Sequence, residues 1–161
     1  MLETSGKSLF YAKGLKFSCI RCSACCRHDA GYVFLSLNDT SRLEAALNIS
    51  HEEFTYTYCR WIPSLSGILK LSLKEKYNFD CIFWAEDEGG CSVYEARPLQ
   101  CRAFPFWDSA LNSPRAWKAL AKDCPGMNQG SVYSEEEINK WLSLREKEPI
   151  IFRRTEKEGE F

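Results

Sequence analysis

The chain has no apolar run that approaches the length of a membrane span and no long run of Lys and Arg. A membrane-spanning helix needs about 20 consecutive apolar residues, so we expect no such helix. Near the start, Lys7, Lys13 and Lys16 interrupt the sequence, and we expect no signal peptide there. The formal net charge of −1 gives no support for binding to nucleic acid or to an anionic membrane. These absences predict a cytoplasmic protein whose thiols stay reduced.

Internal repeats and low-complexity stretches are also missing. A chain of 161 residues suits one domain, which we expect to span residues 1–161. A hydrophobic content of 45% and an aromatic content of 14% supply enough bulky side chains for a core. Residues 150–161 are rich in charge, and we expect them to form a frayed tail.

Short strands are predicted in the middle of the chain. Residues 69–74 alternate apolar and polar side chains, which is typical of a half-exposed strand. Residues 81–84 and 91–94 flank an acidic turn that contains glycine, and this arrangement predicts a β-hairpin.

Short helices are predicted on both sides of these strands. Residues 50–53 and 134–137 match the capping box that begins many helices. Residues 38–40 can cap another helix, and residues 95–102 predict a short one with Pro98 in its first turn. We therefore expect a small α+β domain, organised around a cysteine-ligated metal centre.

Cysteine is the residue type that the chain has in abundance, with nine in total. Four of them fall within eight positions, in the run Cys19-Ile20-Arg21-Cys22-Ser23-Ala24-Cys25-Cys26. A CxxC spacing allows two sulfurs to converge on one metal from a tight turn. An odd number of cysteines also fits a closed disulfide framework poorly. The run predicts a metal or iron–sulfur centre.

The other cysteines extend the candidate site. Cys81, Cys91 and Cys101 recur at equal spacing, which is compatible with neighbouring turns of one compact unit. Consecutive side chains diverge in extended backbone, so we expect Cys25 and Cys26 to serve different metals or to bridge two. We predict two metal positions, or one polynuclear cluster, with eight ligands: Cys19, Cys22, Cys25, Cys26, Cys81, Cys91, Cys101 and Cys124.

Other interpretations exist for several residues. Buried small cysteines are common in cores, which is an alternative for the later ligands and an equal one for Cys59. His28 could ligate zinc or iron, and hydrogen bonding in a loop is its alternative; His51 is expected to be solvated. Four arginines directly adjoin a cysteine and could donate hydrogen bonds to sulfur: Arg21, Arg27, Arg60 and Arg102.

The pattern resembles the CxxCxxCC cysteine-cluster family of zinc- or iron-chelating domains. The resemblance rests on the run from Cys19 to Cys26, on Cys81-Ile82-Phe83, on the stretch from Gly90 to Phe106, and on Cys124-Pro125-Gly126. It implies bound zinc, iron or an iron–sulfur cluster in a cytoplasmic bacterial protein. Some relatives are flagellin lysine N-methylases, which carry a similar array in longer chains. This chain has no GxGxG-like turn for S-adenosylmethionine, so the resemblance does not carry the methylase activity across.

Three functional hypotheses follow. The first is a redox or accessory protein that holds an iron–sulfur cluster, with 4Fe–4S as a candidate because bacterial ferredoxins combine a similar run with a distant Cys-Pro. The second is a zinc module whose metal stabilises a surface for an unidentified protein partner. The third is a methyltransferase-related enzyme or a thiol-based redox catalyst. The sequence identifies no catalytic residue.

Overall fold

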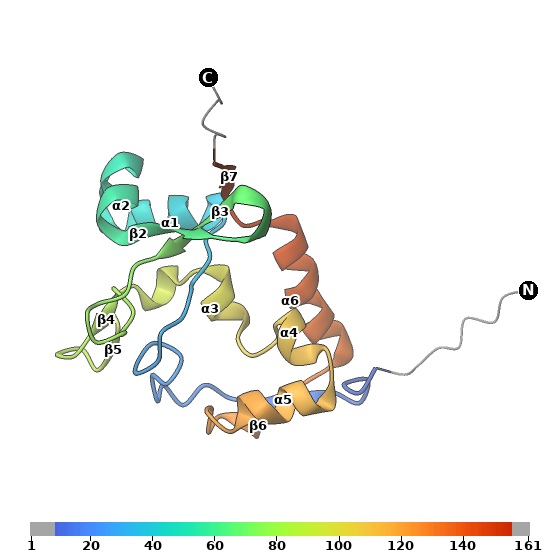
Figure 1. Ribbon diagram of the computed structural model, residues 1–161. Coiled ribbons are helices and arrows are strands. Elements are labelled where there is room, and N and C mark those ends of the chain that lie inside the picture. The colour runs from blue at the N-terminus through green and yellow to red at the C-terminus, as the bar shows by residue number, and fades with distance from the viewer. Residues whose placement is uncertain (1–8, 156–161) are drawn as a thin grey trace, which may run out of the picture. The chain divides into compact units, whose positions relative to one another are not determined.

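The computed structural model describes residues 9–155, which form two compact units (Figure 1). Unit 1 contains residues 9–22 and 104–144, and unit 2 contains residues 23–103 and 145–155. The chain passes between the units three times, so neither unit is continuous in the sequence. Helices and strands are mixed in both units, which confirms the α+β class.

Unit 1 is built on a pair of antiparallel strands. Strand β1 (Leu15–Phe17) pairs with β6 (Met127–Tyr133), and Phe17 lies opposite Met127. Helices α4 (Asp108–Leu111) and α5 (Pro114–Ala121) precede β6. The buried side chains of the unit form one cluster: Tyr11, Phe17, Phe106, Ala110, Leu111, Trp117, Met127 and Ile138.

Helix α6 (Glu135–Lys147) begins in unit 1, and its residues from Arg145 onward belong to unit 2. The predicted capping box is confirmed, because the Glu137 amide donates to Ser134 Oγ at 3.2 Å and the Ser134 amide donates to the Glu137 carboxylate at 2.8 Å. Ile138, one residue later, is fully buried. The cap therefore fixes the helix start at the position where its apolar face meets the core.

Unit 2 contains a three-stranded antiparallel sheet in the order β2, β3, β7. The strands are β2 (Cys59–Pro63), β3 (Ile68–Leu73) and β7 (Phe152–Arg154), and the turn η1 (Leu65–Gly67) joins the first two. Strand β3 confirms the prediction for residues 69–74. Strand β7 corrects the prediction of a frayed tail, because its backbone pairs with the second edge of β3. The rest of that tail, residues 156–161, lies outside the described residues.

Two helices precede the three-stranded sheet of unit 2 in the sequence. Helix α1 (Leu37–Leu47) is capped by Ser36, slightly earlier than residues 38–40 predicted, and α2 (His51–Tyr58) is capped by Ser50 as predicted. Their apolar faces join those of the sheet in a second core, which contains Leu35, Leu43, Phe54, Cys59, Leu71, Leu73, Phe83 and Val93.

The remaining elements of unit 2 carry the later cysteines. Strands β4 (Trp84–Ala85) and β5 (Gly90–Cys91) form the predicted hairpin. The helix predicted over residues 95–102 is divided into a 3₁₀ turn η2 (Tyr94–Ala96) and helix α3 (Leu99–Ala103). The break falls at Arg97, which is extended because the following Pro98 disfavours helical backbone before it.

Across residues 9–155, no helix combines the length and the apolar character that crossing a membrane requires.

Candidate metal centre

The thiols of Cys25 and Cys26 converge. Their sulfurs lie 3.7 Å apart, because the backbone turns here and the Cys26 amide donates to the Ser23 carbonyl at 2.9 Å. The prediction that these two side chains diverge is therefore wrong, because it assumed an extended backbone and the backbone turns here. Two sulfurs bound to one tetrahedral zinc ion at about 2.3 Å lie about 3.8 Å from each other. The pair thus has the separation of two ligands on one ion.

Cys81 is hydrogen-bonded to this turn through its main chain. Its amide donates to the Cys26 carbonyl at 2.7 Å. The neighbouring Asp80 is only 4% exposed, and its carboxylate accepts from the His28 amide at 3.4 Å and lies 3.4 Å from Nε of Arg27. Asp80 therefore links the segment that follows Cys26 to the segment that precedes Cys81.

Cys91 lies on the second strand of the hairpin, and Cys81 lies three residues before the first strand. Cys91 pairs with Trp84 across the two strands, and the Ser92 amide donates to the Phe83 carbonyl at 2.8 Å. Each thiol also accepts a hydrogen bond from the amide two residues later, which belongs to Phe83 for Cys81 and to Val93 for Cys91. An amide that donates to sulfur stabilises the thiolate, which is the form that binds metal.

Cys101, on α3, completes a group of five thiols in unit 2. Burial raises the pKa of Cys101, and repulsion from the thiolates of Cys81, Cys25 and Cys91 raises it further. Burial likewise raises the pKa of Cys81 to about 11. Thiolates in this group repel one another unless a cation lies among them. As predicted from their spacing, the three later cysteines Cys81, Cys91 and Cys101 belong to one compact unit.

A hydrogen bond links the thiols of Cys25 and Cys26. The hydrogen bond from Cys26 lowers the pKa of Cys25 to about 7, and the same bond raises the pKa of Cys26. The pair therefore loses its first proton readily and its second with difficulty. A metal ion that binds both sulfurs has to displace this second proton.

Arg97, whose guanidinium lies over the Tyr94 ring, is a positive charge that acts on several thiols of the group. It lowers the pKa of Cys25, of Cys91 and of Cys101 in each case, after larger effects of hydrogen bonding and burial. Arg97 adjoins no cysteine in the sequence, so adjacency to cysteine does not identify it. Its position inside the stretch from Gly90 to Phe106, which carries the family pattern, was the available signal.

Three of the four arginines that adjoin a cysteine have other contacts. Arg27 pairs with Asp80 and lies over the Trp84 ring at 4.6 Å. Arg60 pairs with Glu75 at 3.1 Å. Arg102 donates to the main-chain carbonyl of Arg97 at 3.1 Å. Adjacency in sequence therefore did not identify the donors to sulfur, because consecutive side chains on a strand or turn point in different directions.

Unit 1 contains a second group, made of Cys19, Cys22 and Cys124. The first two are exposed, and Cys124 packs against the core of the unit. The backbone next to them is in close contact, because the Ser18 amide donates to the Gly126 carbonyl at 3.1 Å. A Cβ atom at Gly126 would lie 2.2 Å from the Ser18 carbonyl oxygen, so only glycine fits here.

The remaining candidates have structural roles. Cys59 is 5% exposed in the core of unit 2, and burial raises its pKa to about 12. His28 contributes its main-chain amide to Asp80. His51 is exposed and its Nδ1 lies 2.6 Å from the Glu44 carboxylate. Core packing is thus the role of Cys59.

The five grouped thiols of unit 2 fit a metal held by thiolates, because sulfur is a ligand that zinc and iron accept. One pair of them, Cys25 and Cys26, also has the sulfur–sulfur separation of two ligands on one ion. Among residues 9–155, no three Cys, His, Asp or Glu side chains already stand in a finished coordination geometry. The cysteines are thus gathered by the fold, and coordination requires a further convergence of their side chains.

Comparisons with known proteins agree with this chemistry. An uncharacterized protein of Methanocaldococcus jannaschii, MJ0661, is 28% identical over 139 residues, which are 83% of this chain and 70% of that protein. No solved structure matches the chain. A family model described as "CxxCxxCC: Putative zinc- or iron-chelating domain" matches residues 18–125. Because this match spans well over half of the chain, the protein belongs to the CxxCxxCC family and is, at that level of description, a metal-chelating protein.

Proposed function

We propose that the protein binds a metal ion in unit 2 through the thiolates of Cys81, Cys91, Cys101 and the pair Cys25–Cys26. The observation that carries the proposal is the 3.7 Å separation of the paired sulfurs. Burial raises the pKa of the other three thiols, whereas a main-chain amide lowers it for Cys81 and Cys91 and the charge of Arg97 lowers it for Cys91 and Cys101. Five thiolates exceed the four that a tetrahedral ion takes, so one of them stays outside the coordination of that ion.

Zinc is the metal that this geometry supports best. In a 4Fe–4S cluster held by four cysteines each iron takes one thiolate, whereas two sulfurs on one tetrahedral ion lie about 3.8 Å apart. The observed separation of Cys25 and Cys26 therefore favours two ligands on one ion. Bound in this way, zinc would stabilise the fold, because closed thiolate sites couple metal binding to folding.

An iron–sulfur cluster with a redox or accessory role is the second candidate. The number of thiols favours a cluster, because it exceeds the four that one zinc ion takes. The group in unit 2 has five thiols, and unit 1 has three more: Cys19, Cys22 and Cys124. A cluster of the 2Fe–2S type would also accept two cysteines on one iron, which accommodates the Cys25–Cys26 pair. In this case the bound group would supply electron transfer.

Metal analysis of protein purified without oxygen, together with its absorbance spectrum, tests both candidates. A colourless protein with about one zinc per tetrathiolate site supports the first. A brown protein with iron and acid-labile sulfide replaces it with the second. Less than one metal ion of either kind per chain, after supply of both metals during expression, would contradict thiolate metal binding altogether.

A further inference from the structure

Helix α3 carries Cys101, yet it has only five residues. Isolated helices of this length are not stable in water, because nucleation of a helix is unfavourable. The direction of the Cys101 side chain therefore depends on what holds the ends of α3. Three sets of contacts within unit 2 hold it, and each includes a residue that lies far from Cys101 in the sequence.

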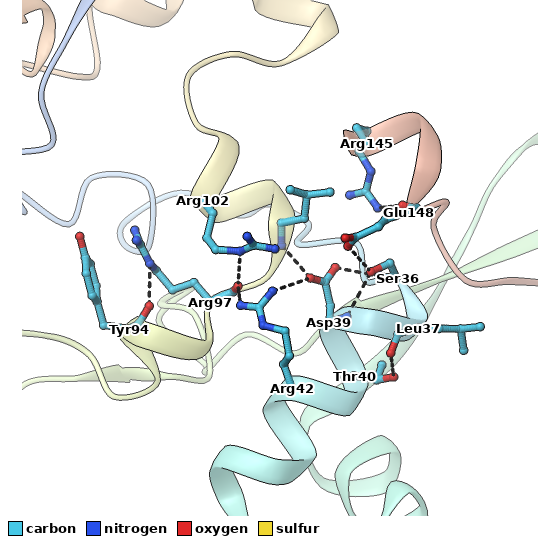
Figure 2. A network of polar contacts seen from close by, with 11 residues as sticks. Ser36, Leu37, Asp39, Thr40, Arg42, Tyr94, Arg97, Arg102, Arg145 and Glu148 are labelled. Atoms are coloured by element: carbon cyan, nitrogen blue, oxygen red, sulfur yellow. Dashed lines mark hydrogen bonds and ion pairs between the residues drawn. The ribbon is translucent and has the colours of Figure 1, made fainter. Parts of the chain in front are cut away.

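The first contact comes from Asp39 at the start of α1 (Figure 2). Asp39 is fully buried, and its Oδ1 accepts a hydrogen bond from the Leu99 amide at 2.7 Å. Its Oδ2 accepts from the Ser36 amide at 2.9 Å. One carboxylate thus caps the start of its own helix and the first amide of α3. Burial of a carboxylate is unfavourable unless it is hydrogen-bonded, and here both oxygens are.

The second set of contacts holds the residue before Pro98. Nη2 of Arg42 and Nε of Arg102 both donate to the main-chain carbonyl of Arg97, at 2.8 and 3.1 Å (Figure 2). Nη1 of Arg42 lies 4.0 Å from Asp39 Oδ1, which orients the Arg42 side chain. Helix α1 therefore contacts the chain on both sides of Pro98.

The third set of contacts comes from Gln100, which precedes Cys101. Its Oε1 accepts from the Phe34 amide at 3.0 Å, and its Nε2 donates to the Tyr32 carbonyl at 2.7 Å. The side-chain amide thus pairs with the backbone as a neighbouring strand would. Because Gln100 and Cys101 are consecutive, this pairing limits rotation of α3 about its own axis.

We propose that Asp39, Arg42 and Gln100 are positioning residues that fix α3, so that only the side chain of Cys101, and not its helix, has to move when metal binds. This inference rests on the proposed function, because it assumes that Cys101 is a ligand. Residues that orient ligands through hydrogen bonds change metal affinity by about 10-fold to 100-fold when they are removed.

Three variants test the inference: Asp39→Ala, Asp39→Asn and the matched charge control Glu44→Gln, which lies on the same helix. In the metal-free protein, the rate at which iodoacetamide alkylates each cysteine is followed by peptide mass spectrometry. We expect Asp39→Ala to accelerate alkylation of Cys101 and to leave the buried Cys59 unchanged. Asp39→Asn keeps an acceptor for the Leu99 amide and should recover most of the protection.

The metal-loaded proteins provide the second measurement, the rate of zinc release to an excess of chelator. We expect about 10-fold to 100-fold faster release from Asp39→Ala than from wild type or Glu44→Gln. Equal acceleration at Cys59 and Cys101 would show a general loss of structure and would overturn the inference, as would unchanged rates at both. If Asp39→Ala does not fold, Gln100→Ala gives the same comparison. If wild type binds no metal, the proposed function fails, and the alkylation rates still decide whether Asp39 positions Cys101.

Discussion

The amide of Cys81 donates to the carbonyl of Cys26 at 2.7 Å, so two cysteines that are distant in the sequence are joined through their main chains. This contact holds the Cys25–Cys26 end of the early cysteine run against the segment that precedes the later hairpin. It depends on Asp80, whose buried carboxylate lies between the His28 amide and Arg27. The first prediction concerns this carboxylate.

Replacement of Asp80 by Ala should weaken the contact between Cys26 and Cys81. The variant removes the carboxylate that pairs with Arg27 and accepts from the His28 amide, and an unpaired buried polar group costs about 1–3 kcal/mol. We expect unit 2 to lose free energy of unfolding by that amount and to retain less metal, as measured by denaturant titration and metal analysis. Asp87→Asn is the control, because Asp87 is exposed in the hairpin turn. Equal stability and metal content of the two variants would contradict the role of Asp80.

The second prediction separates ligands from core cysteines. Cys101→Ser should lower metal content together with the metal-dependent part of thermal stability, because a thiolate ligand is lost. Cys59→Ala should leave metal content unchanged and lower stability in the presence and absence of metal alike, since it shortens a side chain in a packed core. Both are measured by metal analysis and by thermal unfolding with and without chelator. Full metal content in Cys101→Ser would remove Cys101 from the ligand set.

Local features of the site could be predicted from the sequence, and features that depend on distant contacts could not. The hairpin between Cys81 and Cys91 follows from turn residues and flanking strand residues within a few positions, and it was found. The burial of Asp80, by contrast, depends on Arg27 and the His28 amide. The convergence of Cys25 and Cys26 depends on a turn whose sequence contains neither glycine nor proline, so the usual turn signals were missing.

The fold was predictable to a similar extent. Ser50 and Ser134 were recognised as caps because capping is local. Strand β7 was missed because Phe152–Arg154 is short and charged, and it becomes a strand only through pairing with β3. The eight proposed ligands remain a prediction, for which the structure supplies the two groups described above.

The third prediction concerns pH. Cys26 donates the hydrogen bond that lowers the pKa of Cys25 from its ordinary 9.0 to about 7. In metal-free protein, Cys26→Ala should therefore raise the pKa of Cys25 back toward 9.0, measured as the pH dependence of its alkylation rate. Because the folded pKa of Cys25 is depressed, its contribution to stability is fully present above pH 9.0 and is lost as the pH falls through about 7. Cys59→Ala is the control, and an unchanged Cys25 profile in Cys26→Ala would show that Cys26 does not lower the pKa of Cys25.

The fourth prediction concerns the cysteines of unit 1. Gly126 lies against the Ser18 carbonyl, where an added Cβ would approach to 2.2 Å. Gly126→Ala should therefore push apart the backbone next to Cys19 and Cys124, at a cost of about 1–3 kcal/mol. Gly31→Ala is the matched control, because a Cβ there meets nothing within 4 Å.

Denaturant titration gives the stability of both glycine variants, and alkylation in the presence and absence of metal gives the accessibility of Cys19 and Cys22. If these thiols take part in metal binding, metal should protect them in wild type and Gly31→Ala and protect them less in Gly126→Ala. Metal that protects the thiols of unit 2 and leaves Cys19 and Cys22 equally reactive in all three proteins would confine the metal site to unit 2. The exposed cysteines of the CxxCxxCC run would then act outside the coordination of that metal.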